Sequence, residues 1–186
     1  MEEIRRVAAA YYEHLPAKDK KSLRGTFKAM DKNRDGKISL LEYLDYFKKK
    51  NGTDFTHQSI CRALDMNVNG SLDFEEAIVL FYIMESGRTI ICMSCKTFMA
   101  GVYFSCSQCF FNVASRRSFD ICCDCYGGKK FTHHSDAIFC DNFSLLSQSR
   151  SLALEASAEK RSRVVEGCNW MLGVANLAVS AGCIIM

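Results

Sequence analysis

Hydrophobic and polar positions along the chain predict helices in three regions. Residues 2–14 have the spacing of a short amphipathic helix. The apolar residues on its face are Ile4, Val7, Ala8 and Tyr11. From residue 18 to about 86, helix-like runs alternate with loops rich in Asp, Asn and Gly, and residues 147–166 form a third helical candidate. The pattern therefore predicts a mainly α-helical protein.

The stretch from residue 18 to 86 contains an internal repeat. Asp31 and Asp65 occupy the same place in its two copies, 34 residues apart. Apolar residues precede each of them on one helical face: Leu23, Phe27 and Met30 in the first copy, and Ile60, Cys61 and Leu64 in the second. His57 stands where the first copy has Leu23, so we expect weaker packing there.

Each copy continues into a match to the twelve-residue calcium loop. A hard cation needs six to eight oxygen ligands, which this loop supplies from positions 1, 3, 5, 7, 9 and 12. The predicted ligands are Asp31, Asn33, Asp35, Lys37 (backbone carbonyl), Ser39 and Glu42, and then Asp65, Asn67, Asn69, Ser71 (backbone carbonyl), Asp73 and Glu76. Gly36 and Gly70 permit the sharp turn at position 6. At position 8, Ile38 and Leu72 are expected to pair as a short antiparallel strand that couples the two sites.

This tandem pair resembles the EF-hand lobe of the calmodulin superfamily over about residues 18–86. The resemblance implies two bound calcium ions. Each loop offers three carboxylates, which leaves the affinity open within the sensor range of roughly 10⁻⁷–10⁻⁵ M. Loops that bind magnesium, or bind ions only weakly, remain an alternative.

The cysteines cluster after residue 90. Of 11 Cys among 186 residues, eight lie between residues 92 and 140. The N-terminus is charged and lacks the apolar stretch of a secretory signal, so we expect a reducing compartment, where paired thiols are zinc ligands rather than disulfides. Three Cys-x-x-Cys pairs and two histidines supply ligands for two zinc ions: Cys92, Cys95, Cys106, Cys109, Cys122, Cys125, His133 and His134.

The block from Ser118 to Tyr126, with the thiolate pairs before it and histidines after it, resembles the ZZ-type zinc finger. That family's cross-brace implies one zinc on Cys92, Cys95, Cys122 and Cys125, and the other on Cys106, Cys109 and two histidines. Spacing alone leaves a sequential pairing open. The adjacent histidines depart from the family, in which the two are usually separated. His134 fits best and His133 second, with Asp136 or Cys140 as substitutes.

Eight ligands for two ions close both zinc shells, so we expect no enzyme activity. A redox site or a zinc- or thiol-dependent enzyme is the alternative. The remaining cysteines are interpreted as small hydrophobes: Cys61, Cys123, Cys140 and Cys168.

ZZ modules bind proteins, and some capture a free N-terminus with carboxylates beside the first zinc. Only Asp120 remains of those acids, because Met93 and Ser118 occupy the other positions, so a different partner is expected.

Residues 167–186 carry no charge and end in Cys183-Ile184-Ile185-Met186, a prenylation box of the farnesyl type. The alternative is a buried apolar C-terminal helix. A single lipid chain holds a protein only marginally, and the basic residues before the tail offer a second membrane signal: Lys160, Arg161 and Arg163. This segment and Trp170 also form the pattern of helices that EF-hand grooves accept.

Composition and charge fit a folded protein without nucleic-acid partners. Apolar residues make up 48% of the chain, charged residues 24%, and the net charge is only +3. We therefore predict an EF-hand pair with an N-terminal helix over residues 1–86, a small cross-brace zinc module over 87–142, and a helical tail over 143–186. Each of the first two is expected to have its own source of stability.

The predicted function is a calcium-responsive, zinc-stabilised adaptor for protein or peptide partners. Calcium would open the helix pair and expose an apolar groove, lined by residues such as Phe27, Met30, Leu41, Leu44, Phe74 and Ile78. A calcium buffer or structural scaffold is the alternative. We expect a cytoplasmic protein, peripheral to membranes if Cys183 is prenylated, and the nucleus stays open.

Overall fold

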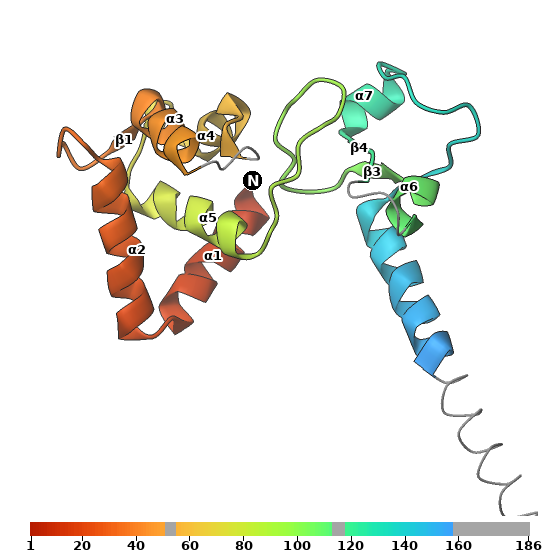
Figure 1. The fold of residues 1–186 in the computed structure, drawn as a ribbon, viewed down its shortest axis with the longest axis horizontal. Coiled ribbons are helices and arrows are strands. Elements are labelled where there is room, and N and C mark those ends of the chain that lie inside the picture. The colour runs from red at the N-terminus through yellow and green to blue at the C-terminus, as the bar shows by residue number, and fades with distance from the viewer. Residues whose placement is uncertain (51–54, 113–117, 158–186) are drawn as a thin grey trace, which may run out of the picture. The chain divides into compact units, whose positions relative to one another are not determined.

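The computed structural model describes residues 1–50, 55–112 and 118–157 (Figure 1). Residues Met1–Asn142 and Phe143–Met186 form two compact units. A helix begins at residue 142, at the end of the first unit, and continues through the described part of the second unit to residue 157. Within the described residues, no helix combines the length and hydrophobicity needed to cross a membrane.

The first part of the chain is helical, as predicted. Its elements are α1 (Glu2–His14), α2 (Ala17–Met30), β1 (Ile38–Ser39), α3 (Leu40–Lys49), α4 (Gln58–Leu64), β2 (Ser71–Leu72) and α5 (Phe74–Glu85). The predicted strand pairing is confirmed, because Ile38 lies opposite Leu72 in an antiparallel ladder and both side chains are fully buried. This ladder joins the two predicted calcium loops through the hydrophobic core.

Helices α3 and α5 begin in the same way, directly after a predicted calcium loop. Ser39 and Asp73 are their N-caps, and each forms a capping box with the Glu three residues later, Glu42 or Glu76. These four residues are positions 9 and 12 of the two loops. The residues that start each helix are thus the same ones predicted to close the ion site.

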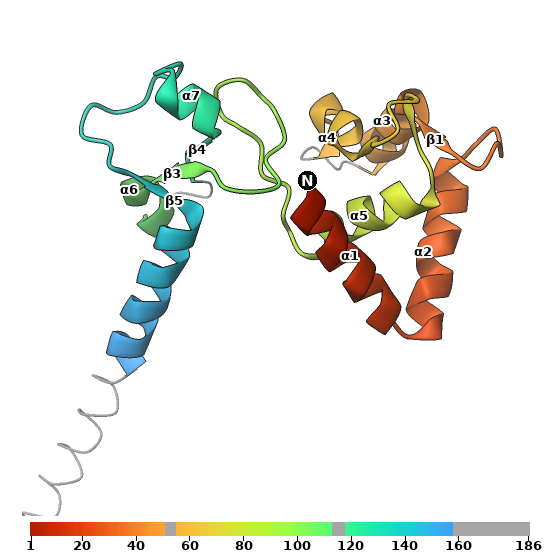
Figure 2. The ribbon, with the colours of Figure 1, turned by 180° about the vertical axis from the view of Figure 1, so that it is seen from behind.

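The N-terminal helix α1 packs on α5, and Figure 2 shows α1 and α2 joined by a short turn. Ile4 and Ala8 are buried in the core, whereas Val7 and Tyr11 remain 44% and 39% exposed. The buried face is therefore narrower than predicted, because α1 contacts its neighbours through an i, i+4 ridge. Tyr11 lies against Tyr82 of α5, with ring centroids 5.5 Å apart.

The second incoming helix is shorter than the repeat predicts. Helix α4 begins at Gln58, whereas α2 extends over 14 residues from Ala17 to Met30. His57 is the N-cap of α4 and precedes its first helical residue, whereas Leu23 lies within α2. The predicted apolar face beyond it is buried as expected: Ile60, Cys61 and Leu64.

The cysteine-rich segment forms a small mixed structure around its own core. Its elements are β3 (Phe104–Cys106), α6 (Ser107–Phe111), β4 (Asp120–Ile121), α7 (Cys123–Gly127) and β5 (Phe139–Asp141). The strands pair in the order β4-β3-β5, all antiparallel. Aromatic rings surround the buried residues, and Phe104 stacks on Tyr126 with centroids 3.9 Å apart. Few side chains are fully enclosed in this core, so hydrophobic burial alone supplies little stability.

Candidate metal centres

Both predicted calcium loops are closed by the Glu at position 12. Glu42 is only 8% exposed, and its Oε1 accepts hydrogen bonds from the backbone N–H groups of Lys32 (2.8 Å) and Asn33 (3.2 Å). Its Oε2 accepts from the N–H of Ser39 at 2.9 Å. Burial raises the pKa of Glu42, but these hydrogen bonds outweigh it and hold the pKa below its usual value. The carboxylate is thus kept in the ionised form that a cation requires.

The second loop repeats this arrangement. Glu76 accepts from the N–H groups of Met66 at 2.7 Å and Asp73 at 3.1 Å. At the other end of each loop, Asp31 and Asp65 accept from the N–H of the glycine at position 6, at 3.0 and 2.8 Å. The carboxylates at positions 1 and 12 therefore turn inward in both loops, and their oxygens are the donors that calcium prefers.

Residues at position 5 order the middle of each loop. Asp35 Oδ1 accepts from the N–H of Lys37, and Asn69 Oδ1 accepts from the N–H of Ser71, at 2.9 and 3.0 Å. Gly36 has a φ of 82°, in the left-handed region that a side chain disfavours, which explains why glycine stands there. Both loops are thus preorganised by their own predicted ligands.

Position 4 of the second loop is strained. Val68 has a φ of 55° and is 86% exposed, so packing does not compensate for the left-handed backbone of a β-branched residue. Replacing Val68 by Asn should increase the free energy of unfolding by about 1 kcal/mol, because Asn adopts this conformation more readily. Urea denaturation of the full chain measures the change.

The matched control for this substitution is Val102→Asn. Val102 is 52% exposed and is not among the described residues with positive φ. The same gain in both variants would show that loss of exposed apolar surface, and not backbone strain, is responsible.

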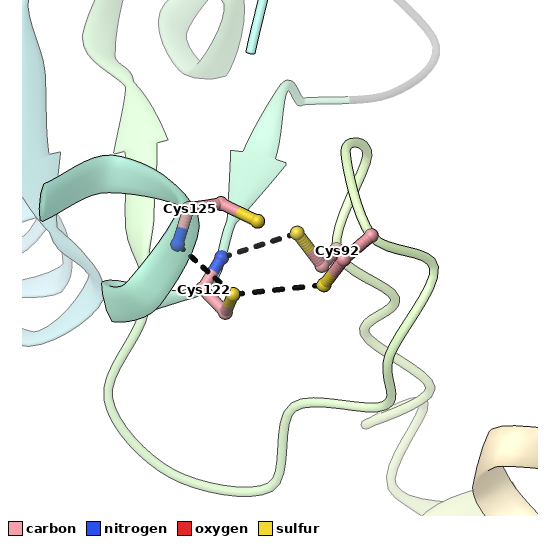
Figure 3. A group of neighbouring side chains, drawn as sticks. Cys92, Cys122 and Cys125 are labelled. Carbon is pink, nitrogen blue, oxygen red and sulfur yellow. Dashed lines mark hydrogen bonds between the residues drawn. The ribbon is translucent and has the colours of Figure 1, made fainter. Parts of the chain in front are cut away.

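The first cysteine cluster joins two Cys-x-x-Cys pairs that are distant in sequence. Its four sulfur atoms lie within 4.8 Å of one another: Cys92, Cys95, Cys122 and Cys125. The Sγ atoms of Cys95 and Cys122 are 3.7 Å apart, so no disulfide joins them. Figure 3 shows the backbone N–H of Cys122 donating to Cys92 Sγ, and that of Cys125 donating to Cys122 Sγ. Such N–H groups stabilise thiolates.

The second cluster combines two thiols and both histidines. Cys106, Cys109, His133 and His134 form a four-donor group within the same 4.8 Å limit. Cys106 Sγ lies 3.3 Å from His134 Nε2, and Cys109 Sγ lies 3.3 Å from His133 Nε2. The structure therefore groups the cysteines as the cross-brace implies rather than sequentially.

These spacings fit tetrahedral zinc. Bond lengths of about 2.3 Å to sulfur and about 2.05 Å to nitrogen place two sulfurs about 3.8 Å apart and a sulfur and a nitrogen about 3.6 Å apart. The observed sulfur–sulfur distance is 3.7 Å, and sulfur–nitrogen distances run from 3.3 to 3.7 Å. Both clusters are thus compatible with zinc binding in donor type and in geometry.

Neighbouring side chains tune the donors. A hydrogen bond with the Thr97 hydroxyl lowers the pKa of the Cys95 thiol to about 6, whereas burial raises that of Cys122 to about 12. Burial, aided by the nearby His134, lowers the pKa of His133 and favours its neutral, metal-binding form. Phe119 stacks on the His133 ring at 3.9 Å and fixes its plane. Sequence reasoning assigned no role at the clusters to Thr97 or Phe119, since neither is a metal donor at a spaced position.

The two alternative ligands predicted from the sequence, Asp136 and Cys140, are not among the donors of the second group. Asp136 Oδ1 contacts His134 Nδ1 at 2.8 Å, which leaves Nε2 of that ring facing Cys106. Asp136 therefore orients a ligand rather than serving as one. Cys140 lies in β5 and belongs to neither four-donor group. Cys61 and Cys123 are also outside both groups. Cys168 and the lipidation candidate Cys183 lie outside the described residues.

Removing the orienting carboxylate should weaken the second cluster. We expect Asp136→Ala to lower zinc affinity there roughly tenfold or more, because His134 loses its fixed tautomer and orientation. Competition with a colorimetric chelator measures this affinity. Asp124→Ala is the control, because Asp124 is an exposed carboxylate in α7 outside both clusters. Equal weakening in the two variants would remove the orienting role from Asp136.

A family model for the EF-hand domain pair matches residues 20–82. The EF-hand pair expected from the sequence is confirmed over these residues. Comparisons with curated proteins and with solved structures give no match. The EF-hand pair supports calcium binding, and the two cysteine and histidine clusters are compatible with zinc.

Proposed function

We propose that this protein is a calcium-responsive, zinc-stabilised adaptor that binds protein or peptide partners. The observation that carries the proposal is the presence, in one compact unit, of an EF-hand pair with two complete loops and of two four-donor clusters. The loops would bind two calcium ions and respond to their concentration. The clusters would bind two zinc ions and hold the second fold together.

The role we propose is not enzymatic. Each cluster supplies four protein donors, which fills a tetrahedral shell and leaves no position for a substrate. Burial raises the pKa of Cys61 to about 11, the opposite of what an activated nucleophile requires. The thiol with a lowered pKa, Cys95, is one of the four donors of the first cluster and would be occupied by the metal. Structural zinc sites match this chemistry better than a zinc- or thiol-dependent catalyst does.

The cysteine-rich module is proposed to be of the ZZ type and to bind a partner other than a basic N-terminal peptide. The carboxylate of Asp120 already accepts hydrogen bonds from the hydroxyls of Ser105 and Ser118. An incoming ammonium group would have to compete with both. This supports the expectation, drawn from Met93 and Ser118, that the module does not capture a free N-terminus.

The calcium-sensing surface would be the apolar groove of the EF-hand pair. Phe27 and Met30 are buried, and the other predicted groove residues pack partly against the same core or, like Leu41, are exposed. Helix α1 already covers part of this face, with Tyr12 against Phe74 at 6.0 Å. A cavity of about 620 Å³ lies between α1 and α5, lined in part by Tyr12, Phe74 and Ile78. Calcium binding is proposed to change how α1 and α5 pack.

Two measurements test the proposal. Metal analysis of the full-length protein should give two calcium and two zinc ions per chain. Calcium should then increase the fluorescence of an apolar dye such as ANS in the zinc-loaded protein. Two calcium ions bound without a change in dye binding would favour the buffer or scaffold. A chain without zinc would contradict the zinc-stabilised part.

The tail would add membrane attachment. Residues 158–186 lie outside the described part, so prenylation of Cys183 stays a sequence-based proposal, as does a basic second signal at residues 160–163. A cytoplasmic location at membrane surfaces and docking of the Trp170 segment in the groove are proposals on the same sequence-based grounds. Trp170 is the only tryptophan, so a calcium-dependent shift of its emission is the expected result. Emission and vesicle binding that both ignore calcium would leave the tail as a passive anchor or a packed helix.

A further inference from the structure

Residues 90–100 form a hairpin that carries the first zinc-compatible Cys pair in its turn. Ile91 and Phe98 form an antiparallel bridge, and the N–H of Met99 donates to the carbonyl of Ile90 at 2.8 Å. The N–H of Cys92 donates to the carbonyl of Thr97 at 2.9 Å. Cys92 and Cys95 are therefore fixed on a local, hydrogen-bonded unit.

The two faces of this hairpin pack into two different cores. Successive side chains of an extended chain point to opposite sides. Facing the core of the EF-hand pair are Ile91, Phe98 and Ala100. Facing the zinc-compatible core are Ile90, Cys92 and Met99. Phe98 is only 6% exposed, so it contributes a full aromatic side chain to a core built almost entirely by residues before 86.

A hydrogen bond fixes the same hairpin to α4. Ser59 Oγ donates to the carbonyl of Lys96, directly after Cys95, at 3.0 Å. Helix α4 ends at Leu64, directly before Asp65, which is position 1 of the second calcium loop. A single short element thus links the first cluster to the helix that positions that loop.

We propose that metal binding by the first cluster and calcium binding by the second loop are coupled through this hairpin, with Phe98 as the positioning residue. The inference rests on the proposed function, because it requires both metals to bind. A metal ion that holds Cys92 and Cys95 at a fixed separation keeps the hairpin folded. The folded hairpin then holds Phe98 in the core and α4 in place. Asp65 is then preorganised, so less ordering accompanies calcium binding. The coupling is positive.

Thermodynamic linkage sets the size and symmetry of the effect. Allosteric couplings commonly change affinity about fivefold or more, and each ligand must change the affinity of the other by the same factor. We expect calcium to bind the second loop at least about fivefold more tightly in zinc-loaded protein than in zinc-stripped protein. Zinc affinity should rise by an equal factor when calcium is present.

The decisive experiment is calcium titration calorimetry on the zinc-loaded full-length chain and its variants. Phe98→Ala should keep two zinc ions and lose most of the calcium affinity gained from zinc. Phe98→Leu should retain most of it. Phe111→Ala is the matched control, because Phe111 belongs to the same module but is 39% exposed and lies outside both cores.

If Phe98→Ala does not fold, Ser59→Ala tests the same link by removing only one hydrogen bond, and a smaller decrease is expected. Wild-type protein that binds no zinc would overturn the zinc assignment and the coupling together. Protein that binds zinc, but whose calcium affinity is indifferent both to zinc and to Phe98→Ala, would overturn the coupling alone.

Discussion

Removing zinc from the full-length protein should unfold the cysteine-rich module. The core of this module contains few fully enclosed side chains beyond two of the cysteines themselves. Structural zinc contributes apparent binding free energies of about 10–16 kcal/mol in small zinc-dependent domains, which exceeds what such a core supplies. A thiophilic chelator should therefore abolish hydrogen-exchange protection in β3, β4, β5 and α7.

Single ligand substitutions should give the same result. Cys106→Ser and Cys122→Ser each remove one donor, and each should lose at least one zinc ion and become sensitive to proteolysis. Cys123→Ser is the matched control, since Cys123 is adjacent to Cys122 in sequence, exposed, and outside both clusters. If both ligand variants keep two zinc ions and normal protection, the cross-brace assignment is wrong.

Removal of zinc should lower hydrogen-exchange protection in part of the EF-hand pair without unfolding it. Separate sources of stability were the expectation from sequence, and most of the EF-hand core does come from α1 to α5. The structure adds Ile91 and Phe98 to that core, so withdrawal of the hairpin exposes part of it. Protection in α4 should decrease after chelation, while α5 remains protected.

The metal-binding patterns could be predicted because ligand chemistry fixes residue type and spacing. Position 8 of each loop predicted the Ile38–Leu72 ladder, and the pairs of cysteines predicted two four-donor groups. The pairing of those groups came from resemblance, since spacing does not say which pairs meet. The sequence left open which residues complete the second group. In the structure His133 and His134 both belong to it, and Asp136 contacts His134 Nδ1 instead.

The hairpin could not be predicted, because its two-sided packing depends on contacts distant in sequence. Thr97, Phe98 and Met99 follow a Cys pair without any helical or alternating pattern long enough to assign a face. Nothing in the sequence shows that Phe98 and Met99 enter different cores. The exposure of Val7 has a similar origin, since helical periodicity predicts a face but not how wide the neighbouring surface is.

Glu76→Gln should reduce calcium affinity at the second loop at least tenfold. The substitution removes one carboxylate charge and replaces one closing oxygen by an amide nitrogen. In the structure, Oε1 accepts from Met66 N–H and Oε2 accepts from Asp73 N–H. Whichever way the Gln amide is oriented, its NH2 group therefore faces one of these backbone N–H groups, and two hydrogen-bond donors oppose each other. The N-terminal capping of α5 weakens together with the ion site, and isothermal titration measures the affinity.

The neighbouring residue provides a control with the same change in charge. Glu75 is exposed, belongs to the same turn of α5 and has no place among the loop ligands, so Glu75→Gln should bind calcium as the wild type does. Weaker binding at the first loop is also expected in Glu76→Gln, because Ile38 and Leu72 join the loops through a buried ladder. Glu42→Gln should show the reciprocal pattern. Wild-type affinity in both Glu42→Gln and Glu76→Gln would contradict the calcium assignment, whereas loss confined to the substituted loop would show that the ladder holds the loops together without coupling them.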